Sequence, residues 1–558
     1  MQTTSFKHIA QLAEIIQQNG ITKVVISPGS RNAPLIIAFD SHPNIETFVV
    51  HDERSAAFFA LGMADELQQG VAVVCTSGSA ALNYAPAVAE AHYREIPLLV
   101  LTADRPEHLI DQGDGQCMQQ FDVYHNFIKQ SRQLEVEPAE TQILFAVEHL
   151  LTRPRGPVHI NIPLDEPLYN TADFQDTSNY EVEIKETNSW SDLEKEEVLS
   201  IWKTTAKKLI IVGQMVPNQR LQILLDALAE DSSVAVLVEN TSNIKRFTKF
   251  VHAIDRTLAV ISEEEVADFK PDLLVSIGGA IISKKIKRFF RDNKSQHNWR
   301  VGEFTIDEDT YQSKTKSLAI KPEIFFEFIN AIDYVPESNF GNKWKSKDFM
   351  AYSAHEEFLF NAPFSDLKAF DFIIDTLPEG VSLQMANSSV VRYCQLFEPI
   401  VSVNYFSNRG VSGIDGSTST ALGMAVANPS RLVVLVTGDV SFFYDSNALW
   451  NSYLPSNFRI VLINNNGGGI FNIIDGPKQS KQNNYFVAPH QAKAEHICAA
   501  HQVNYLLVSD LADLDSKMAV FYGEPDNNRP MLLEVITDSE RNHIVLEDYF
   551  KSLSKSFK

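Results

Sequence analysis

A short pattern recurs at a fixed interval along the chain. The pentapeptide ALGMA occupies residues 60–64 and again 421–425, 361 positions later, and an apolar run follows both times, VAVVCTSG at 71–78 and LVVLVTGD at 432–439. The same interval aligns a further pair of apolar runs, LLVLTAD and RIVLINN. Several segments held in one register indicate two copies of a single folding unit.

Apolar runs alternate with longer amphipathic segments over most of the sequence. This alternation predicts the α/β class, with parallel sheets covered by helices on both faces. Two polar stretches, residues 169–198 and about 335–355, interrupt the pattern and are interpreted as linkers. They divide the chain into three expected domains, and the repeat relates the first to the third. The expected boundaries are 1–180, 190–335 and 355–558.

The composition narrows the possible partners and the compartment. The 48 Lys and Arg residues face 71 Asp and Glu, a net charge of -23, which argues against nucleic acid or an anionic membrane as the main partner. The four cysteines show no metal-ligand or CxxC spacing, so reduced thiols in the cytoplasm are expected. The N-terminus does not resemble a signal peptide, and no apolar run approaches the ~18 residues of a membrane span.

Polar residues follow two neighbouring strands of the third expected domain. Asp439 ends one apolar run and Asn465 follows the next, after one strand-helix-strand passage. We expect their side chains to meet at one sheet edge. A carboxylate, an amide oxygen and a backbone carbonyl suit Mg²⁺, and the helix after Asp439 favours an anion such as a diphosphate. Taken separately, Asp439 and Ser441 would equally well cap a helix, and NNNGGG would form a turn.

The spacing of Gly438–Asp439 and Asn464–Asn465 resembles the signature of thiamine diphosphate-dependent enzymes. This resemblance implies that the metal ion, Mg²⁺ or Mn²⁺, binds to the Asp439 carboxylate, the Asn465 amide oxygen and the Gly467 carbonyl. It also implies that the cofactor contacts Gly438 and Ser441.

These enzymes also require a glutamate beside the cofactor's aminopyrimidine ring. Glu53 follows an apolar strand and opens an apolar helix, where burial would raise its pKa. In isolation it would more simply complement the helix dipole. The 361-residue interval places Ile414 at the position equivalent to Glu53. By resemblance Ile414 enforces the bent cofactor conformation, although a lone isoleucine is usually part of a core.

Longer segments carry a closer resemblance. SPGSRNAPL, HDERSAAFFALGMA, LTADRP, GPVHINIPLDEP, NSSVVR, NRGVSGIDGSTSTALG and INNNGGGIF are similar to segments of the 2-succinyl-5-enolpyruvyl-6-hydroxy-3-cyclohexene-1-carboxylate synthase family, thiamine diphosphate-dependent transferases of menaquinone biosynthesis. The resemblance implies decarboxylation of 2-oxoglutarate and 1,4-addition of the succinyl-semialdehyde carbanion to isochorismate. The alternatives are another 2-oxo acid decarboxylase or carboligase similar to acetolactate synthase, and a non-catalytic binding protein on the same fold.

Both implied substrates carry two carboxylates, so an acidic protein must gather basic groups at one pocket. By resemblance the substrate and catalytic residues, besides Glu53, are Ser30, Arg31, Arg105, Gln116, Lys284, Ser388, Arg392 and Arg409, with Ile470 and Phe471 as apolar walls. Any one of these arginines alone would more simply form a surface salt bridge.

Two positions depart from the family pattern. Lys285 stands where an arginine is expected, and Gly115 stands where an asparagine is common. The family's architecture implies a homodimer or homotetramer, with the cofactor between the first domain of one subunit and the third domain of another.

Overall fold

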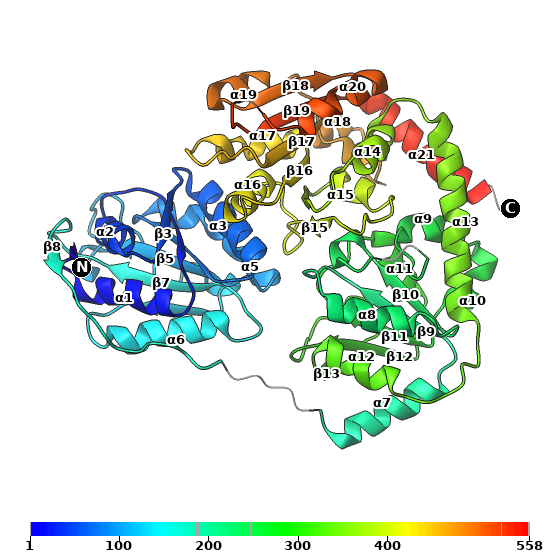
Figure 1. Ribbon diagram of the computed structural model, residues 1–558, viewed down its shortest axis with the longest axis horizontal. Helices are drawn as coiled ribbons and strands as arrows, with labels where there is room; N and C mark the ends of the chain where they lie inside the picture. The colour runs from blue at the N-terminus through cyan, green and yellow to red at the C-terminus, as the bar shows by residue number, and fades with distance from the viewer. Residues whose placement is uncertain (1, 185–189, 246–247, 475, 526, 556–558) are drawn as a thin grey trace.

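The computed structural model describes residues 2–184, 190–245, 248–474, 476–525 and 527–555. Three parallel β-sheets define an N-terminal, a middle and a C-terminal domain, which Figure 1 shows at the left, the lower right and the top. Helices pack on both faces of the sheets, and the predicted α/β class is confirmed.

The N-terminal domain contains a six-stranded parallel sheet in the order β3-β2-β4-β5-β7-β6. Helices cover both of its faces, and every residue of β4 and β5 is therefore buried. Its strands are β2 (Lys23–Ile26), β3 (Glu46–Val49), β4 (Val71–Cys75), β5 (Leu98–Asp104), β6 (Gln130–Gln133) and β7 (Val158–Pro163). Its helices are α1 (Lys7–Gln18), α2 (Ala33–Ser41), α3 (Glu53–Leu67), α4 (Ser79–Asn83), α5 (Ala85–Tyr93) and α6 (Ala139–Leu151). Strands β1 (Gln2–Thr4) and β8 (Thr171–Asp173) form a separate two-stranded antiparallel sheet.

The C-terminal domain repeats this arrangement, with its strands in the order β15-β14-β16-β17-β19-β18 and all neighbouring pairs parallel. Its strands are β14 (Ser382–Met385), β15 (Asn404–Phe406), β16 (Val433–Gly438), β17 (Phe458–Asn464), β18 (Asn504–Val508) and β19 (Met531–Ile536). Its helices are α14 (Asp366–Asp375), α15 (Ser389–Cys394), α16 (Ser417–Ala427), α17 (Asp439–Tyr444), α18 (Asn483–Val487), α19 (Glu495–His501), α20 (Leu511–Tyr522) and α21 (Ser539–Lys555).

The two copies meet through helices α3 and α16, which contain the repeated ALGMA segments. A Cβ atom on Gly62 would collide with the carbonyl of Thr420, and one on Gly423 would collide with the carbonyl of Phe59. The two contacts exchange under the 361-residue interval, so the copies are related by a pseudo-twofold axis through this helix pair. The absent side chains allow the helix backbones to approach closely.

The middle domain contains a five-stranded parallel sheet in the order β10-β9-β11-β12-β13. Its strands are β9 (Lys208–Val212), β10 (Val234–Val238), β11 (Leu273–Ile277), β12 (His297–Gly302) and β13 (Lys316–Ala319). Its helices are α7 (Asp192–Thr204), α8 (Gln219–Leu228), α9 (Ile254–Ala259), α10 (Val266–Phe269), α11 (Lys284–Asp292) and α12 (Pro322–Asn330), and α13 (Phe340–Asn361) leads on to the C-terminal domain.

Most of residues 335–355, which we expected to be a linker, lie in helix α13 between the middle and C-terminal domains. Trp344, Ala351 and Leu359 are buried on one side of this helix, and many of its other positions carry charged residues. The other expected linker, 169–198, includes β8 and the start of α7, and its residues 185–189 lie outside the described part of the chain.

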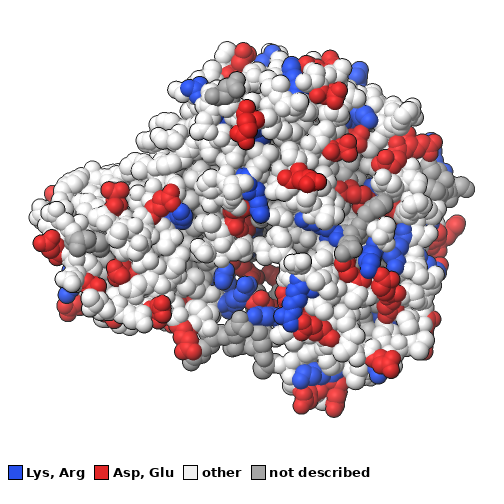
Figure 2. Space-filling view, viewed as in Figure 1, with Lys and Arg blue, Asp and Glu red and all other residues white. Residues whose placement is uncertain are grey.

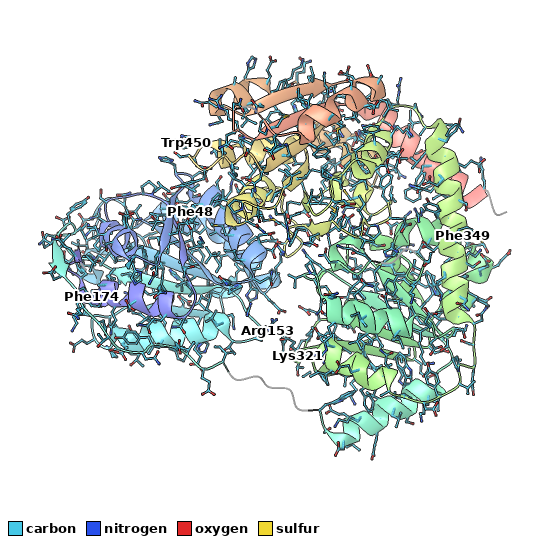
Figure 3. All side chains as sticks on the ribbon, in the orientation of Figure 1. Phe48, Arg153, Phe174, Lys321, Phe349 and Trp450 are labelled. Atoms are coloured by element: carbon cyan, nitrogen blue, oxygen red, sulfur yellow. The ribbon has the colours of Figure 1, made fainter. Side chains whose placement is uncertain are left out.

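The middle domain meets the other two domains at a cavity of about 600 Å³, which is lined in part by Arg153, Arg300 and Arg409. Figure 2 shows basic side chains gathered at a hollow between the N-terminal and middle domains, where Figure 3 labels Arg153. Among the described helices, none is both long and apolar enough to cross a membrane.

Candidate active site

Asp439 and Asn465 lie at the carboxyl ends of the adjacent parallel strands β16 and β17. The Asp439 carboxylate accepts hydrogen bonds from the backbone N–H of Gly467 (2.9 Å) and of Val440 (2.7 Å). Burial raises the pKa of this carboxyl group. A buried acidic group at the start of α17 is therefore held in place by the turn that follows β17.

The amide of Asn465 is oriented so that its oxygen is left without a partner. Its Nδ2 donates to Asp366 Oδ2 at 3.0 Å, whereas Oδ1 is buried and accepts no hydrogen bond. An unpaired buried acceptor is costly unless another group satisfies it. The carbonyl of Gly467 accepts one bond, from Gly469 N at 2.8 Å, which leaves a second lone pair.

These three oxygens fit a small divalent cation that also takes phosphate oxygens and water. The described residues hold no group of three or more His, Cys, Asp or Glu side chains suited to a metal ion. The donor set here is different in kind, because it combines one carboxylate with an amide and a carbonyl.

Asp366 supports this site and was not identified from the sequence. It opens α14 and is fully buried among polar partners, with Thr537 Oγ1 donating to its Oδ1 at 2.5 Å. Burial raises its pKa to about 6. Its only sequence signal is a first-turn acidic residue after Ser365, which is typical of many helices.

His490 is a second residue that sequence reasoning missed. Its Nε2 lies 3.4 Å from Asp439 Oδ2, and its backbone N–H donates to the carbonyl of Asn466. The Asp439 carboxylate is therefore approached both by the His490 imidazole and by the turn after β17. No spacing in the sequence connects His490 to Asp439.

Ser441 and Ile414 are brought together by one hydrogen bond. The Ser441 hydroxyl donates to the Ile414 carbonyl at 2.9 Å. Ser441 therefore fixes the backbone of Ile414 beside α17, while Gly438 ends the strand before Asp439. These predicted cofactor contacts form one cluster in the C-terminal domain.

Glu53 opens α3 in the N-terminal domain and is half-buried in the single chain. Asn83 Nδ2 donates to its Oε2 at 3.4 Å. A pocket of about 320 Å³ surrounds it, lined by His51, Asp52, Glu53, Arg54, Asn83 and Trp450. Asp439, Asn465 and Ile414 do not line this pocket.

Arg31 and Arg105 form a pair in the N-terminal domain. Arg31 is 5% exposed and donates to the Leu164 carbonyl at 2.9 Å. Burial lowers its pKa, and the positive charge of Arg105 lowers it further. Arg105 donates to the carbonyl of Gly115 at 3.1 Å, which gives this unexpected glycine a contact through its backbone.

The remaining predicted residues of this half lie close by. Gln116 follows Gly115 with a positive φ of 57° and packs against Gly78. Ser30 is exposed beside the buried Arg31.

Arg392 and Arg409 form the second pair, in the C-terminal domain. Arg392 donates to the Ser388 carbonyl, and Arg409 Nη1 donates to Asn387 Oδ1 at 2.7 Å. Burial lowers the pKa of both guanidinium groups, and Arg392 lowers that of Arg409 further. Within the described chain, no hydrogen bond or ion pair joins this pair to Arg31 and Arg105.

Lys284 and Lys285 open α11 of the middle domain. The Lys285 ammonium lies 3.5 Å from the centre of the Phe550 ring, and desolvation lowers its pKa. Lys285 therefore contacts helix α21, and both lysines are exposed to solvent. In the C-terminal domain, Ile470 is buried and Phe471 is half-buried, in a short 3₁₀ turn after the NNNGGG segment.

Two parts of the chain match models of known protein domains. Residues 7–125 match the N-terminal TPP-binding domain of thiamine pyrophosphate enzymes, and residues 388–535 match the C-terminal TPP-binding domain. Three curated relatives are all described as 2-succinyl-5-enolpyruvyl-6-hydroxy-3-cyclohexene-1-carboxylate synthase. They come from Flavobacterium psychrophilum (42% identical, covering 97% of this chain and 98% of the relative), Flavobacterium johnsoniae (41%, 97% and 98%) and Porphyromonas gingivalis (37%, 98% and 97%).

Proposed function

Because the chain belongs to the 2-succinyl-5-enolpyruvyl-6-hydroxy-3-cyclohexene-1-carboxylate synthase family of thiamine diphosphate-dependent enzymes, we propose that it decarboxylates 2-oxoglutarate and adds the four-carbon fragment to isochorismate. Bound thiamine diphosphate supplies the nucleophilic carbon that makes loss of CO₂ from a 2-oxo acid feasible. The protein supplies binding, orientation and proton management around that carbon.

The cofactor's diphosphate is anchored through Mg²⁺ or Mn²⁺ in this proposal. The Asp439 carboxylate, the Asn465 amide oxygen and the Gly467 carbonyl hold the cation. The unpaired, buried Oδ1 of Asn465 supports this assignment, since a bound cation would satisfy it.

The remaining residues divide into proton transfer and substrate recognition. Glu53 holds a proton at the aminopyrimidine ring, and Ile414 supports the cofactor's bent shape. The four arginines bind substrate carboxylates, with Ser30, Gln116, Lys284 and Ser388 as further polar contacts and Ile470 and Phe471 as apolar walls.

The active site is completed between subunits of a homodimer or homotetramer in this proposal. Glu53 lies in a pocket that no metal-site residue lines. Large apolar side chains close to it are exposed in the single chain, as expected of a surface that a second subunit covers. They are Val49, Leu82, Tyr444 and Trp450, at 41%, 48%, 55% and 52% exposure.

The observation that carries the substrate assignment is the pair Arg392 and Arg409, two neighbouring guanidinium groups in a protein of net charge -23. Two basic groups at one site suit dicarboxylate substrates better than pyruvate. The test supplies the purified protein with thiamine diphosphate, Mg²⁺, isochorismate and either 2-oxoglutarate or pyruvate. We expect CO₂ release and a succinylated cyclohexene product with 2-oxoglutarate, whereas consumption of pyruvate alone would support an acetolactate synthase-like enzyme.

A further inference from the structure

The segment 408–413, which we call the Arg409 loop, joins β15 to α16 and ends immediately before Ile414. Its two ends are fastened to its own domain. Asn387 Nδ2 donates to the carbonyls of Asn408 (2.7 Å) and Gly413 (2.6 Å). The loop therefore carries a proposed substrate residue and leads directly into a proposed cofactor residue.

The tip of the Arg409 loop is held by the other copy of the fold. The backbone N–H groups of Gly410 and Val411 donate to the two carboxylate oxygens of Glu90, at 2.8 and 2.7 Å. Glu90 lies on α5 of the N-terminal domain and is 1% exposed, whereas Val411 is 45% exposed. The buried side chain of Glu90 thus fixes the solvent-exposed tip of the Arg409 loop.

Glycine at position 410 allows this close approach. A Cβ atom there would lie 2.7 Å from the Glu90 carbonyl oxygen and 3.1 Å from its carboxylate. The contact therefore depends on both partners: Gly410 of the loop has no side chain to block it, and Glu90 of helix α5 supplies the carboxylate.

The equivalent place in the other copy is held by neutral groups. The 361-residue interval relates Gly410 and Val411 to Val49 and Val50, which precede Glu53. Val49 N–H donates to the Tyr453 hydroxyl at 3.1 Å, and Val50 pairs with Asn451, the counterpart of Glu90. Only the Arg409 loop is held by a buried charge.

A buried carboxylate is expensive unless charged or polar partners compensate it. Here the partners are the two loop N–H groups and Arg94, whose Nε lies 3.9 Å away. Bonds from N–H groups to a carboxylate are stronger than neutral ones and fix the geometry more firmly. The buried carboxylate lies where the loop must present the Arg409 guanidinium to substrate, whereas the neutral contacts lie where the residue equivalent to Arg409 is Phe48.

We propose that Glu90 is a positioning residue for the substrate site, which fixes the Arg409 loop so that Arg409 meets a substrate carboxylate. This inference rests on the proposed function for the role of Arg409. It also gives the N-terminal domain two tasks, since Glu53 serves the cofactor while Glu90 orders the loop of its own chain.

The test compares Glu90→Gln with the matched control Glu66→Gln. Glu66 is another buried glutamate of the N-terminal domain that reaches the C-terminal domain, accepting from Asn428 Nδ2 at 2.8 Å, but it does not touch the loop. We expect Glu90→Gln to raise the KM of at least one dicarboxylate substrate about tenfold, with kcat changed less than about threefold. Glu66→Gln should leave both constants near wild type.

Hydrogen exchange gives a readout that does not depend on activity. Peptides covering 408–413 should exchange faster in Glu90→Gln and at the wild-type rate in Glu66→Gln. Gly410→Ala, which pushes the loop from its other side, should raise the same KM, and the double variant should show less than the sum of the two effects. If Glu90→Gln does not fold, the KM of Gly410→Ala tests the proposal instead.

Two results would overturn the proposal. One is a Glu90→Gln enzyme whose KM and loop exchange match those of Glu66→Gln, and the other is additive effects of Glu90→Gln and Gly410→Ala. If wild-type protein shows no activity with 2-oxoglutarate and isochorismate, the proposed function fails instead. The exchange data would then still decide whether Glu90 orders the loop.

Discussion

The two copies of the fold place different side chains at equivalent strand ends. In the C-terminal copy Asp439 and Asn465 follow β16 and β17, and 361 residues earlier the same places hold Gly78 and Asp104. Gly78 has no side chain to bind a cation. The Asp104 carboxylate is already satisfied by Asn161 Nδ2 and Arg105 N, both at 2.8 Å.

This comparison shows how a duplicated sheet can divide one chemical task. The strand order is the same in both copies, because the apolar strands and the α3–α16 contact fix it. The polar residues at the strand ends differ, and among Gly78, Asp104, Asp439 and Asn465 it is Asn465 that has an unpaired buried oxygen. An arginine is kept in both, since Arg31 and Arg392 occupy equivalent positions.

The largest effect is expected from substitution of Glu53, which only the N-terminal copy carries. Glu53→Gln should lower kcat at least about a hundredfold, because the side chain can no longer exchange a proton with the cofactor. Steady-state decarboxylation of 2-oxoglutarate measures this, with Glu46→Gln on the surface of the same domain as control. Full activity in Glu53→Gln would show that the proton assignment is wrong.

The next largest effect is expected from substitution of Asp439, which follows β16 in the C-terminal copy. Asp439→Asn should weaken Mg²⁺ binding in the presence of thiamine diphosphate by more than the roughly tenfold to hundredfold that supporting residues contribute. Calorimetric titration measures the affinity directly. Asp104→Asn, at the position equivalent to Asn465, should leave it unchanged, and equal losses in the two variants would contradict the difference between the copies.

Asp366 should have a smaller influence on the same affinity. Asp366→Asn removes the carboxylate that orients the Asn465 amide, so we expect about a tenfold loss of Mg²⁺ affinity. Thr537→Val removes the bond to the far side of Asp366 and the bond that Thr537 accepts from Asn542 Nδ2, and it should cost less because Asp366 still holds Asn465. Wild-type affinity in Asp366→Asn would mean that the turn after β17 orients Asn465 without help.

The smallest effect concerns the arginines. Arg409→Lys should raise the KM of a dicarboxylate substrate about threefold to tenfold, because an ammonium cannot replace a planar fork that also binds Asn387. Cofactor affinity should not change. Arg431→Lys, at a partly exposed ion pair of the same domain, is the matched control. Equal KM values in the two variants would show that Arg409 does not bind the substrate.

The sequence contained the repeat, the α/β class and the residues at strand ends, because apolar runs and the tips that follow them are local patterns. Asp366 and Glu90 were not predictable in this way. Their partners lie 99 and 320 residues away along the chain, and each looks like an ordinary acidic residue in a helix. Helix α13 was hidden because its buried residues, such as Trp344 and Leu359, are spread among charged ones.

The division of the cofactor site between two subunits can be tested by mixing two inactive variants. Glu53→Gln and Asp439→Asn are unfolded and refolded together, and decarboxylation of 2-oxoglutarate is then measured. If Glu53 of one subunit serves Asp439 of another, each mixed dimer regains one intact site, and random pairing restores about a quarter of wild-type activity. Activity no higher than that of the separate variants, in a sample proven to contain mixed dimers, would contradict a site shared between subunits.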